Sequence, residues 1–367
     1  VISGLDKMSR GILLWRALLN GLGGLGIVLV AIIMLPFLRV GGMQLFQTES
    51  SDKSEKILPR AYELGVATAL VYGALIALCA FTYGILGMTA FDAICHAFPT
   101  IATGGFSTHD SSFGFFQSPG LEWAGTVFMI SGALPFVVMI KSLRGSPRSL
   151  INDAQVRGFL GFLAMVSVIL ALWLVATRGM PFFDALRLSA FNVTSIVTTT
   201  GFASTDYTAW GPFAIGLFFL LTFVGGCSGS TAGAIKIYRL QVAGILTRSH
   251  FLHLISPNRV VTLVYNKRRL PDDVPFSVVA FLAIYMATVG LFTVVLSAMG
   301  LDLVTALSGA ATALGNVGPG LGDTIGPSGT FAPLPAAAKW VLSFAMMLGR
   351  LELFTVLVLL RPEFWRS

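Results

Sequence analysis

Three stretches of the chain combine glycine with threonine, serine or asparagine in the same order, inside a very hydrophobic sequence. They read ATGGFSTHD at residues 102–110, TTTGFASTD at residues 198–206 and LGNVGPGLGD at residues 314–323. In each stretch a glycine precedes the final aspartate by five residues, and a hydroxyl or amide residue precedes that glycine by two. The glycines are Gly105, Gly201 and Gly318, and the polar residues are Thr103, Thr199 and Asn316.

These residue types supply oxygen ligands that carry no charge. Glycine permits the backbone conformations that turn carbonyl groups toward a common axis, and threonine and asparagine add neutral side-chain oxygens. Several such loops around one axis replace the hydration shell of a monovalent cation, as potassium-channel filters do. A divalent-cation filter is expected to carry a ring of carboxylates, and the cores of the three stretches contain none. The pattern therefore predicts a filter for a monovalent cation.

The composition is typical of a multi-pass membrane protein. Of the 367 residues, 55% are hydrophobic and 11% are charged, which is too apolar for a soluble domain. A membrane-spanning helix needs roughly 20 mainly apolar residues. Seven stretches meet this requirement, approximately residues 11–38, 62–88, 118–141, 157–177, 211–237, 277–299 and 335–360.

The basic residues predict the orientation of these spans. Most of the 24 Lys and Arg residues lie in segments 39–60, 141–157 and 236–269 and in the tail from residue 361. By the positive-inside rule these segments are cytoplasmic, and the three glycine-rich loops enter the membrane from outside. The net charge of +7 is explained by these loops, so we expect no nucleic-acid partner.

The three loops occupy equivalent places, between the second and third, fourth and fifth, and sixth and seventh spans. This predicts an all-α membrane protein with pseudo-fourfold repeats of span, re-entrant pore loop and span around a central pore, the first repeat being incomplete. We expect its missing first loop to precede Val1. The predicted divisions are residues 1–60, 61–152, 153–270 and 271–367. The alternative is that membrane loops favour such clusters generally.

Several glycine-rich or proline-containing motifs interrupt the second span of each repeat. SGALP from Ser131 and LGRLE from Leu348 predict kinks, whereas close helix packing explains GLGGLG from Gly21 better. GGCSGSTAGA at residues 225–234 is a poor helix in the middle of a span. We expect an unwound segment that lines the cavity, with close helix contact as the alternative.

Arg350 lies in the last span, ten residues beyond Trp340. At 1.5 Å per residue it is roughly 15 Å deep, near the middle of the bilayer. A single arginine at this depth is functional by default, here as an electrostatic barrier to cations. The alternative is a structural pair with Glu352 or with a helix carbonyl.

The motifs RVGGMQLFQTESSD, ATGGFSTHD, TTTGFASTDY, VGGCSGSTAGAIKIYR and ALGNVGPGLG, in this order, resemble the TrkH/TrkG/KtrB family of potassium uptake proteins. The sequence is more distantly similar to the plant HKT transporters. The resemblance spans the whole chain and implies four repeats around one pore, a homodimer, and a bacterial inner-membrane location. It implies K⁺ binding at Ala102, Thr103, Gly104, Gly105, Thr199, Thr200, Gly201, Asn316, Val317 and Gly318.

The same resemblance implies a gate and a partner. The gating loop comprises Gly225, Gly226, Cys227, Ser228, Gly229, Ser230, Thr231, Ala232 and Gly233, and Arg350 is the pore arginine. Lys236, Arg239 and segment 248–269 are expected to face a cytosolic TrkA-type regulatory subunit. That subunit is expected to bind the nucleotide, and this chain to need no cofactor. Rb⁺ and Na⁺ remain further candidate ions.

Two other functions compete with passive potassium uptake. An ion-coupled symporter, driven by H⁺ or Na⁺, would use the same pore, and a carboxylate on the pore wall would favour it. GCSG at residues 226–229 also fits the GxSG motif of intramembrane serine proteases. Such an enzyme needs a histidine on a neighbouring span, and His96, His109, His250 and His253 fall in re-entrant or loop segments.

Overall fold

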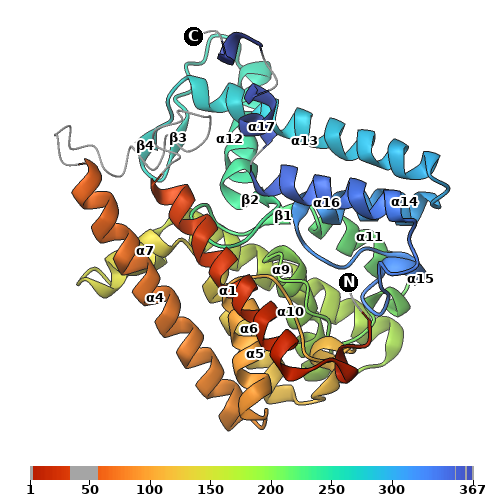
Figure 1. The fold of residues 1–367 in the computed structure, drawn as a ribbon. Helices are drawn as coiled ribbons and strands as arrows, with labels where there is room; N and C mark the ends of the chain where they lie inside the picture. The colour runs from red at the N-terminus through yellow and green to blue at the C-terminus, as the bar shows by residue number, and fades with distance from the viewer. Residues whose placement is uncertain (1–2, 34–56, 352, 360–361, 366–367) are drawn as a thin grey trace.

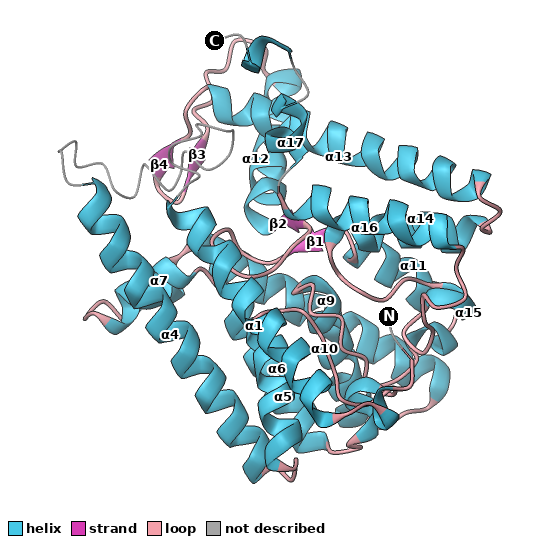
Figure 2. Ribbon diagram, in the orientation of Figure 1, coloured by secondary structure: helices cyan, strands magenta, loops and turns pink. Residues whose placement is uncertain are grey.

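The computed structural model describes residues 3–33, 57–351, 353–359 and 362–365. These residues are mainly helical, and the two pairs of two-residue strands are small features (Figure 2). The helices are α1 Arg10–Ile33, α4 Ile57–Ile85, α5 Ala90–Ile101, α6 Pro119–Ala133, α7 Phe136–Leu143, α8 Arg148–Asn152, α9 Ala154–Arg178, α10 Phe182–Val197, α11 Pro212–Leu221, α12 Ile237–Ile255, α13 Asp273–Ala298, α14 Leu303–Gly315, α15 Gly322–Ile325, α16 Ala336–Arg350 and α17 Leu353–Leu359. The strands are β1 Val224–Gly225, parallel to β2 Ile235–Lys236, and β3 Val264–Tyr265, antiparallel to β4 Arg268–Arg269.

A long helix, a short helix and a second helix follow one another three times along the chain. The three sets are α4–α5–α6, α9–α10–α11 and α13–α14–α16, and in each set the short helix contacts both of its neighbours. Figure 1 shows the last set, in blue, side by side at one end of the molecule. The short helices α5, α10 and α14 have 12, 16 and 13 residues, too few to cross a bilayer. They are therefore re-entrant helices, as the repeat predicts.

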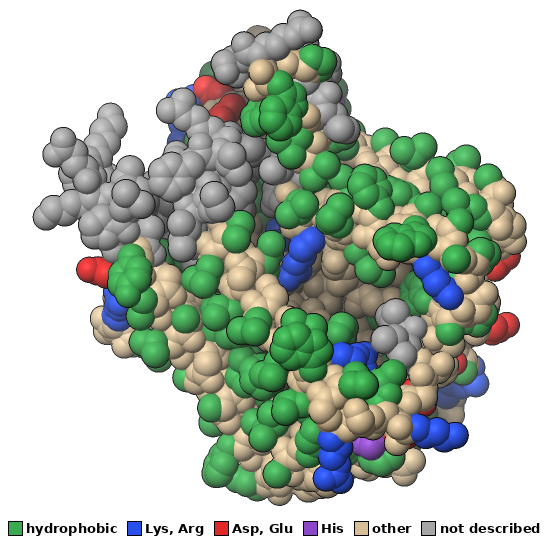
Figure 3. Space-filling model, viewed as in Figure 1, with side chains coloured by type: hydrophobic (Ala, Val, Ile, Leu, Met, Phe, Trp, Pro, Cys, Tyr) green, Lys and Arg blue, Asp and Glu red, His purple; other side chains and the backbone are tan. Residues whose placement is uncertain are grey.

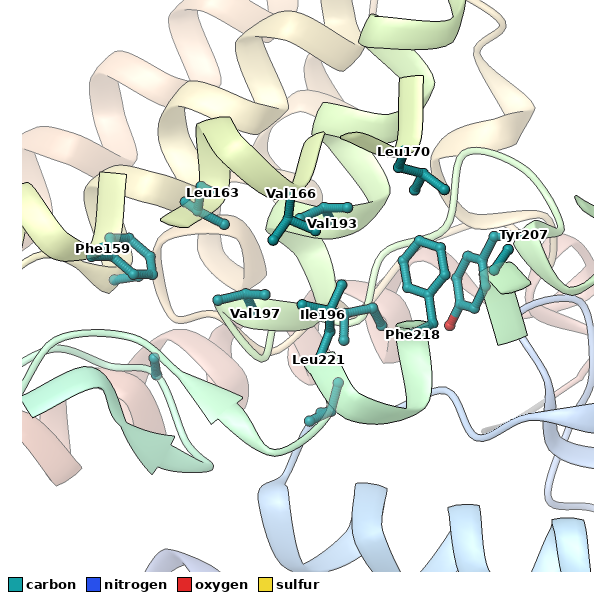
Figure 4. Packing of buried hydrophobic residues seen from close by; sticks show 14 of the residues in the cluster. Phe159, Leu163, Val166, Leu170, Val193, Ile196, Val197, Tyr207, Phe218 and Leu221 are labelled. Carbon is teal, nitrogen blue, oxygen red and sulfur yellow. The ribbon is translucent and has the colours of Figure 1, made fainter. Parts of the chain in front are cut away.

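Each set of helices has its own hydrophobic core. The cluster drawn in Figure 4 joins Leu163, Val166 and Leu170 of α9 to Val193 and Ile196 of α10. Beside them Tyr207 stacks on Phe218 of α11, with 3.9 Å between the ring centroids. Separate clusters join α13, α14 and α16, and α4, α5 and α6. Each cluster also takes in residues of a neighbouring set, such as Val317 in the first and Phe191 in the last. The predicted divisions at residues 61–152, 153–270 and 271–367 therefore stay a prediction.

Contacts between sets arrange the short helices around a common interior. Helix α1 packs on α5, and α6 packs on α10, so that these two helices also support the short helix of the following set. A Cβ atom on Gly24 of α1 would lie 2.8 Å from the Ala102 Cβ atom just after α5. Helix α1 runs without a break through GLGGLG, and close packing is confirmed for Gly21 and Gly24, whereas the Cβ positions of Gly23 and Gly26 are open.

The seven expected spans are only partly continuous helices. Four helices in the described part of the chain are long and apolar enough to cross a membrane: α1, α4, α9 and α13. The third expected span is the pair α6 and α7, which meet at 98°. Pro135 causes this break because it has no N–H group and disfavours helical geometry at Leu134. The kink predicted at SGALP is therefore confirmed.

The fifth and seventh expected spans are also interrupted. The fifth ends as a helix at Leu221 and continues through β1 and β2, and the seventh ends as α16 at Arg350 before α17 begins at Leu353. The first break confirms the unwound segment. Helix α16 ends within LGRLE, and the kink predicted there stays a prediction because Glu352 lies outside the described residues. The motif RVGGMQLFQTESSD, residues 34–38 of the first span, most of segment 39–60 and Glu352 lie outside the described residues.

We predict that Gly349→Ala destabilises the protein. A Cβ atom at Gly349 would lie 1.8 Å from the Leu314 carbonyl oxygen, so α16 must move away from the end of α14. Overpacking of this kind costs about 1–3 kcal/mol, which should appear as a lower melting temperature in detergent. Gly290→Ala in α13 is the matched control, because nothing lies within 4 Å of its Cβ position. Equal melting temperatures for the two variants would contradict the prediction.

Candidate functional site

The three glycine-rich loops meet one another in sequence order. A Cβ atom at Gly105 would lie 2.0 Å from the Thr200 carbonyl oxygen, and one at Gly201 would lie 2.3 Å from the Val317 carbonyl oxygen. The residue before the aligned glycine of one loop thus lies against the aligned glycine of the preceding loop. Only glycine allows this approach. The loops that the sequence aligned are therefore successive walls around one interior, which is hollowed on the face drawn in Figure 3.

The aligned positions share an unusual backbone conformation. Thr103, Thr199 and Asn316 have φ values of 50°, 58° and 56°, in the left-handed region. The glycines two residues later also have positive φ, at 64°, 82° and 119°. Asparagine tolerates the left-handed region, whereas a β-branched threonine does not, and such strain costs about 1–3 kcal/mol per residue. The surroundings of the two threonines must therefore hold this conformation.

Hydrogen bonds orient the carbonyl groups of the loops. The N–H groups of Gly104, Thr200 and Val317 donate to a carbonyl five residues earlier, near the end of the preceding short helix, at 2.8–3.0 Å. The next N–H groups donate to the same short helices: Gly105 to Pro99 O, Gly201 to Ser195 O and Gly318 to Thr312 Oγ1. Because N–H and C=O point in opposite directions across one planar peptide, the preceding carbonyls point away from these helices.

Six carbonyl groups are oriented in this way, two on each wall. They belong to Thr103, Gly104, Thr199, Thr200, Asn316 and Val317, and none of them accepts a hydrogen bond from a described residue. Buried carbonyl groups rarely stay without a partner. Neutral oxygens that are left without a protein donor in this way are suited to replace the water around a monovalent cation. Among the described residues, no group of three or more His, Cys, Asp or Glu side chains is arranged to hold a metal ion.

A carboxylate lies at the N-terminal, outer end of each of the short helices α5 and α14. Asp302 caps α14 by accepting from Thr305 N at 3.0 Å, and these hydrogen bonds lower its pKa below the ordinary value of 3.8. Burial alone would raise the pKa of Asp92, but hydrogen bonds from Thr89 and Thr108 and the nearby His109 lower it. Negative charge at the outer N-terminus leaves the negative end of each helix dipole toward the loops, where it favours a cation.

The segment between α11 and α12, residues 222–236, lies against the bases of all three loops. Thr231 Oγ1 is 3.0 Å from Ile101 O at the end of α5. Gly233 N donates to Thr199 Oγ1 at 2.6 Å, and Ala234 N donates to Gly315 O at 2.9 Å. The close helix contact considered for GGCSGSTAGA is therefore wrong, since this segment is a non-helical loop. We call residues 225–234 the intramembrane loop.

The break between α6 and α7 anchors the other side of the intramembrane loop. Cys227 N donates to Ala133 O at 3.0 Å, and Phe136 N donates to Gly229 O at 3.1 Å. Thr231 Oγ1 also lies 2.9 Å from Gly132 O. Pro135 frees these backbone groups by ending α6, so that a loop from another set can bind them. In the sequence, the motif SGALP predicted the break in the helix but gave no indication that the intramembrane loop binds there.

Arg350 ends α16, and its side chain is half-buried. It lies near Tyr72 of α4, whose hydroxyl donates to Gly21 O of α1 at 2.8 Å. No described carboxylate forms an ion pair with Arg350. The pairing considered with Glu352 involves a residue outside the described part of the chain.

One residue expected to face a partner does not lie on the surface. Arg239 is 6% exposed, and its guanidinium lies over the ring of Phe281, 3.9 Å from the centroid. Its contribution is therefore internal packing between α12 and α13. Lys236 is half-buried and donates to Ala232 O within the intramembrane loop. Exposed basic residues of segment 248–269 include Arg248, Arg259, Lys267, Arg268 and Arg269.

A network at the outer side of the loops was not expected from the sequence. His109 Nδ1 is 2.6 Å from Asp6 Oδ1, and His109 Nε2 is 3.6 Å from Asp92 Oδ1. The Asp110 carboxylate accepts from the N–H groups of Gly4 and Leu5 at 3.0 Å. These contacts join the beginning of the chain to the first of the three loops. The contacts of Asp6, Gly4 and Leu5 connect residues more than 100 positions apart, so no local pattern indicates them.

Long apolar helices, short re-entrant helices and facing loops with free carbonyl oxygens define a multi-pass membrane protein of the pore-loop type. The chain belongs to the TrkH family of cation transport proteins, whose family model matches residues 1–367.

Individual relatives agree with this assignment. The chain is 51% identical, over 364 residues, to the Trk system potassium uptake protein TrkI of Halomonas elongata, covering 99% of this chain and 74% of that protein. It is 39% identical to the TrkH protein of the same organism, covering 100% and 76%. The crystal structure of the potassium transporter TrkH from Vibrio parahaemolyticus superposes with a TM-score of 0.90 at 34% identity, covering 100% of this chain and 75% of that one.

We predict that the Asp302 cap makes stability depend on pH in a defined direction. Because the folded-state pKa of Asp302 is lowered, its contribution is complete above pH 3.8 and is lost as the pH falls through the lowered value. Asp302→Asn keeps an acceptor but cannot titrate, so the native protein should lose melting temperature relative to this variant only below pH 3.8. Asp302→Ala should lose about 1 kcal/mol already at pH 7. A constant difference between native protein and Asp302→Asn from pH 7 to pH 3 would contradict this account.

Proposed function

We propose that this protein takes up K⁺ across the bacterial inner membrane through the three facing loops and a gate beneath them. The observation that carries the proposal is a set of six carbonyl groups, at matched positions of three loops, that point away from the short helices. Supporting it are relatives that are named potassium uptake proteins, at up to 51% identity. Rb⁺ is close to K⁺ in size and is expected to follow it, and Na⁺ is the ion to be discriminated against.

The proposed selectivity filter comprises the loop residues that the sequence singled out. Its oxygen ligands are the carbonyls of Thr103, Gly104, Thr199, Thr200, Asn316 and Val317, and its glycines are Gly105, Gly201 and Gly318. Ala102 ends the first short helix beside them. The free carbonyls and the close approach of successive loops support this role. Dehydrated K⁺ gains its coordination from them without a fixed negative charge that would hold it too tightly.

The proposed gate combines the intramembrane loop with Arg350. The loop is bound to the base of every filter wall, so an ion that leaves the filter inward meets it first. A guanidinium at this depth repels a cation strongly because the surrounding dielectric constant is low. Opening then requires the loop and the arginine to move together or in turn.

The proposed partners are a second copy of this chain and a cytosolic nucleotide-binding subunit of the TrkA type. Segment 248–269 is the proposed contact, since it carries exposed basic side chains at the end of α12, in the loop that follows and in the β3–β4 hairpin. Figure 1 shows the hairpin beside α12. Arg239 takes no part in that contact because it is buried against Phe281. No nucleotide is needed on this chain under this proposal.

We predict that Gly201→Ser reduces selectivity for K⁺ over Na⁺. The added side chain would begin 2.3 Å from Val317 O and 3.0 Å from Pro319 Cδ, so two filter walls must separate. The measurement is flux of K⁺, Rb⁺, Na⁺ and Li⁺ into liposomes that contain the full-length protein. Gly216→Ser in α11 is the control, because its Cβ position is open. Unaltered selectivity in Gly201→Ser would refute the filter assignment.

We predict that Arg350→Ala raises the basal K⁺ flux by roughly tenfold or more, because it removes a positive charge from a low-dielectric path. Lys339→Ala is the matched control, since Lys339 lies on the same helix, is exposed and donates to Ala332 O at the outer end. Its flux should equal that of the native protein. If Arg350→Ala conducts no faster than Lys339→Ala, the arginine is no part of the gate.

A further inference from the structure

The intramembrane loop contacts the strained residues of the filter walls directly. Thr103 Oγ1 donates to Thr231 Oγ1 at 3.1 Å, and Thr199 Oγ1 accepts from Gly233 N at 2.6 Å. Both filter threonines are buried and have the left-handed conformation that a β-branched residue disfavours. Their hydroxyl groups thus have partners on the one segment that the proposed function assigns to gating.

The third wall is held differently. Asn316 has the same left-handed conformation, which asparagine tolerates, and its amide Nδ2 donates to Met346 O of α16 at 3.0 Å. Among the described residues, the hydrogen bond from the intramembrane loop to this wall is that of Ala234 N to Gly315 O, and it does not involve the Asn316 side chain. The side-chain partners therefore differ with residue type. The two threonine side chains form hydrogen bonds with the intramembrane loop, whereas the asparagine side chain forms one with helix α16.

Thr231 makes the contact that joins these parts. Its side chain is 0% exposed, and its Oγ1 lies 3.0 Å from Ile101 O and 2.9 Å from Gly132 O. A hydroxyl has one proton and two lone pairs. Thr231 therefore donates to one of these two carbonyls at a time and accepts from Thr103. It connects the end of α5, the break after α6 and the first filter wall through one oxygen atom.

We propose that Thr231 is a positioning residue that fixes the geometry of the filter as well as the closed gate. When the intramembrane loop withdraws, Thr103 and Thr199 lose the hydrogen bonds that hold their strained backbone. The carbonyls of residues 103–104 and 199–200 can then shift, whereas those of residues 316–317 stay with α16. Selectivity and gating are therefore coupled through the intramembrane loop, and for the first wall through the Thr231 hydroxyl itself. This inference rests on the proposed filter and gate.

The test compares Thr231→Val, which removes the hydroxyl at nearly equal volume, with Thr231→Ser, which keeps it. Full-length protein in liposomes is assayed for basal K⁺ flux and for the ratio of K⁺ to Na⁺ flux. Loss of one net hydrogen bond corresponds to roughly a two- to tenfold change in an equilibrium. We expect Thr231→Val to raise basal flux and to lower the K⁺/Na⁺ ratio by that factor. Thr231→Ser should keep the native ratio.

The matched control is Thr293→Val in α13, another buried threonine, whose hydroxyl donates to Val289 O within its own helix. It should leave both quantities unchanged. Arg350→Ala supplies the contrasting case, in which flux rises while the ratio stays native because no filter threonine loses a partner. If Thr231→Val does not reach the membrane, Thr231→Cys replaces it with the same expected fall, since a thiol is a weak donor and acceptor.

A native K⁺/Na⁺ ratio in Thr231→Val, or an equal fall in Thr231→Ser, overturns the inference. Gly201→Ser in the same assay distinguishes this failure from failure of the filter itself. If Gly201→Ser lowers the ratio and Thr231→Val does not, the filter assignment stands and the coupling is wrong. If neither variant changes the ratio, the filter assignment is wrong, and the coupling falls with it.

Discussion

The arrangement of the site depends on where the backbone N–H groups just after the three short helices donate. Each turns back to its own helix, as Gly104 does to Pro99 O and Thr200 does to Ser195 O. A planar peptide that directs its N–H group into the helix must direct the preceding C=O group away from it. At membrane depth such carbonyls are acceptable only where they face water, an ion or protein. The long apolar helices and their cores serve to hold three such turns face to face.

Close approach of the loops then determines which residues can occupy them. Gly105 lies against Thr200 O and Gly201 against Val317 O, too near for any side chain. The residues two positions earlier need a left-handed backbone but also a side-chain oxygen, which glycine lacks. Threonine meets the second need at the cost of strain, and the intramembrane loop offsets that strain with its own hydrogen bonds. The glycine-rich loops and the intramembrane loop are therefore one hydrogen-bonded unit.

Breaks in helices make this unit possible. Pro135 ends α6, and the freed backbone at residues 132–136 binds the intramembrane loop, which itself replaces a continuous helix between α11 and α12. Each break leaves backbone N–H and C=O groups without helical partners, and the two breaks supply hydrogen-bond partners to each other. Arg350 stands at a third break, between α16 and α17. The three interruptions lie in the second helix of their sets, as an internal repeat requires.

The sequence alone determined the membrane class, the repeat, the aligned glycines and polar residues of the loops, and the breaks at SGALP, GGCSGSTAGA and LGRLE. Each of these features depends on local composition or on spacing within one segment, because hydrophobicity and backbone sterics act over short stretches of the chain. Only the tertiary structure decided that Thr231 binds Thr103, that Arg239 is buried on Phe281, and that His109 meets Asp6 and Asp92. These contacts join residues distant in sequence, and a hydroxyl, guanidinium or imidazole gives no local signal of which partner it will meet. Which distant residues become hydrogen-bond or packing partners is determined by how the repeats pack together.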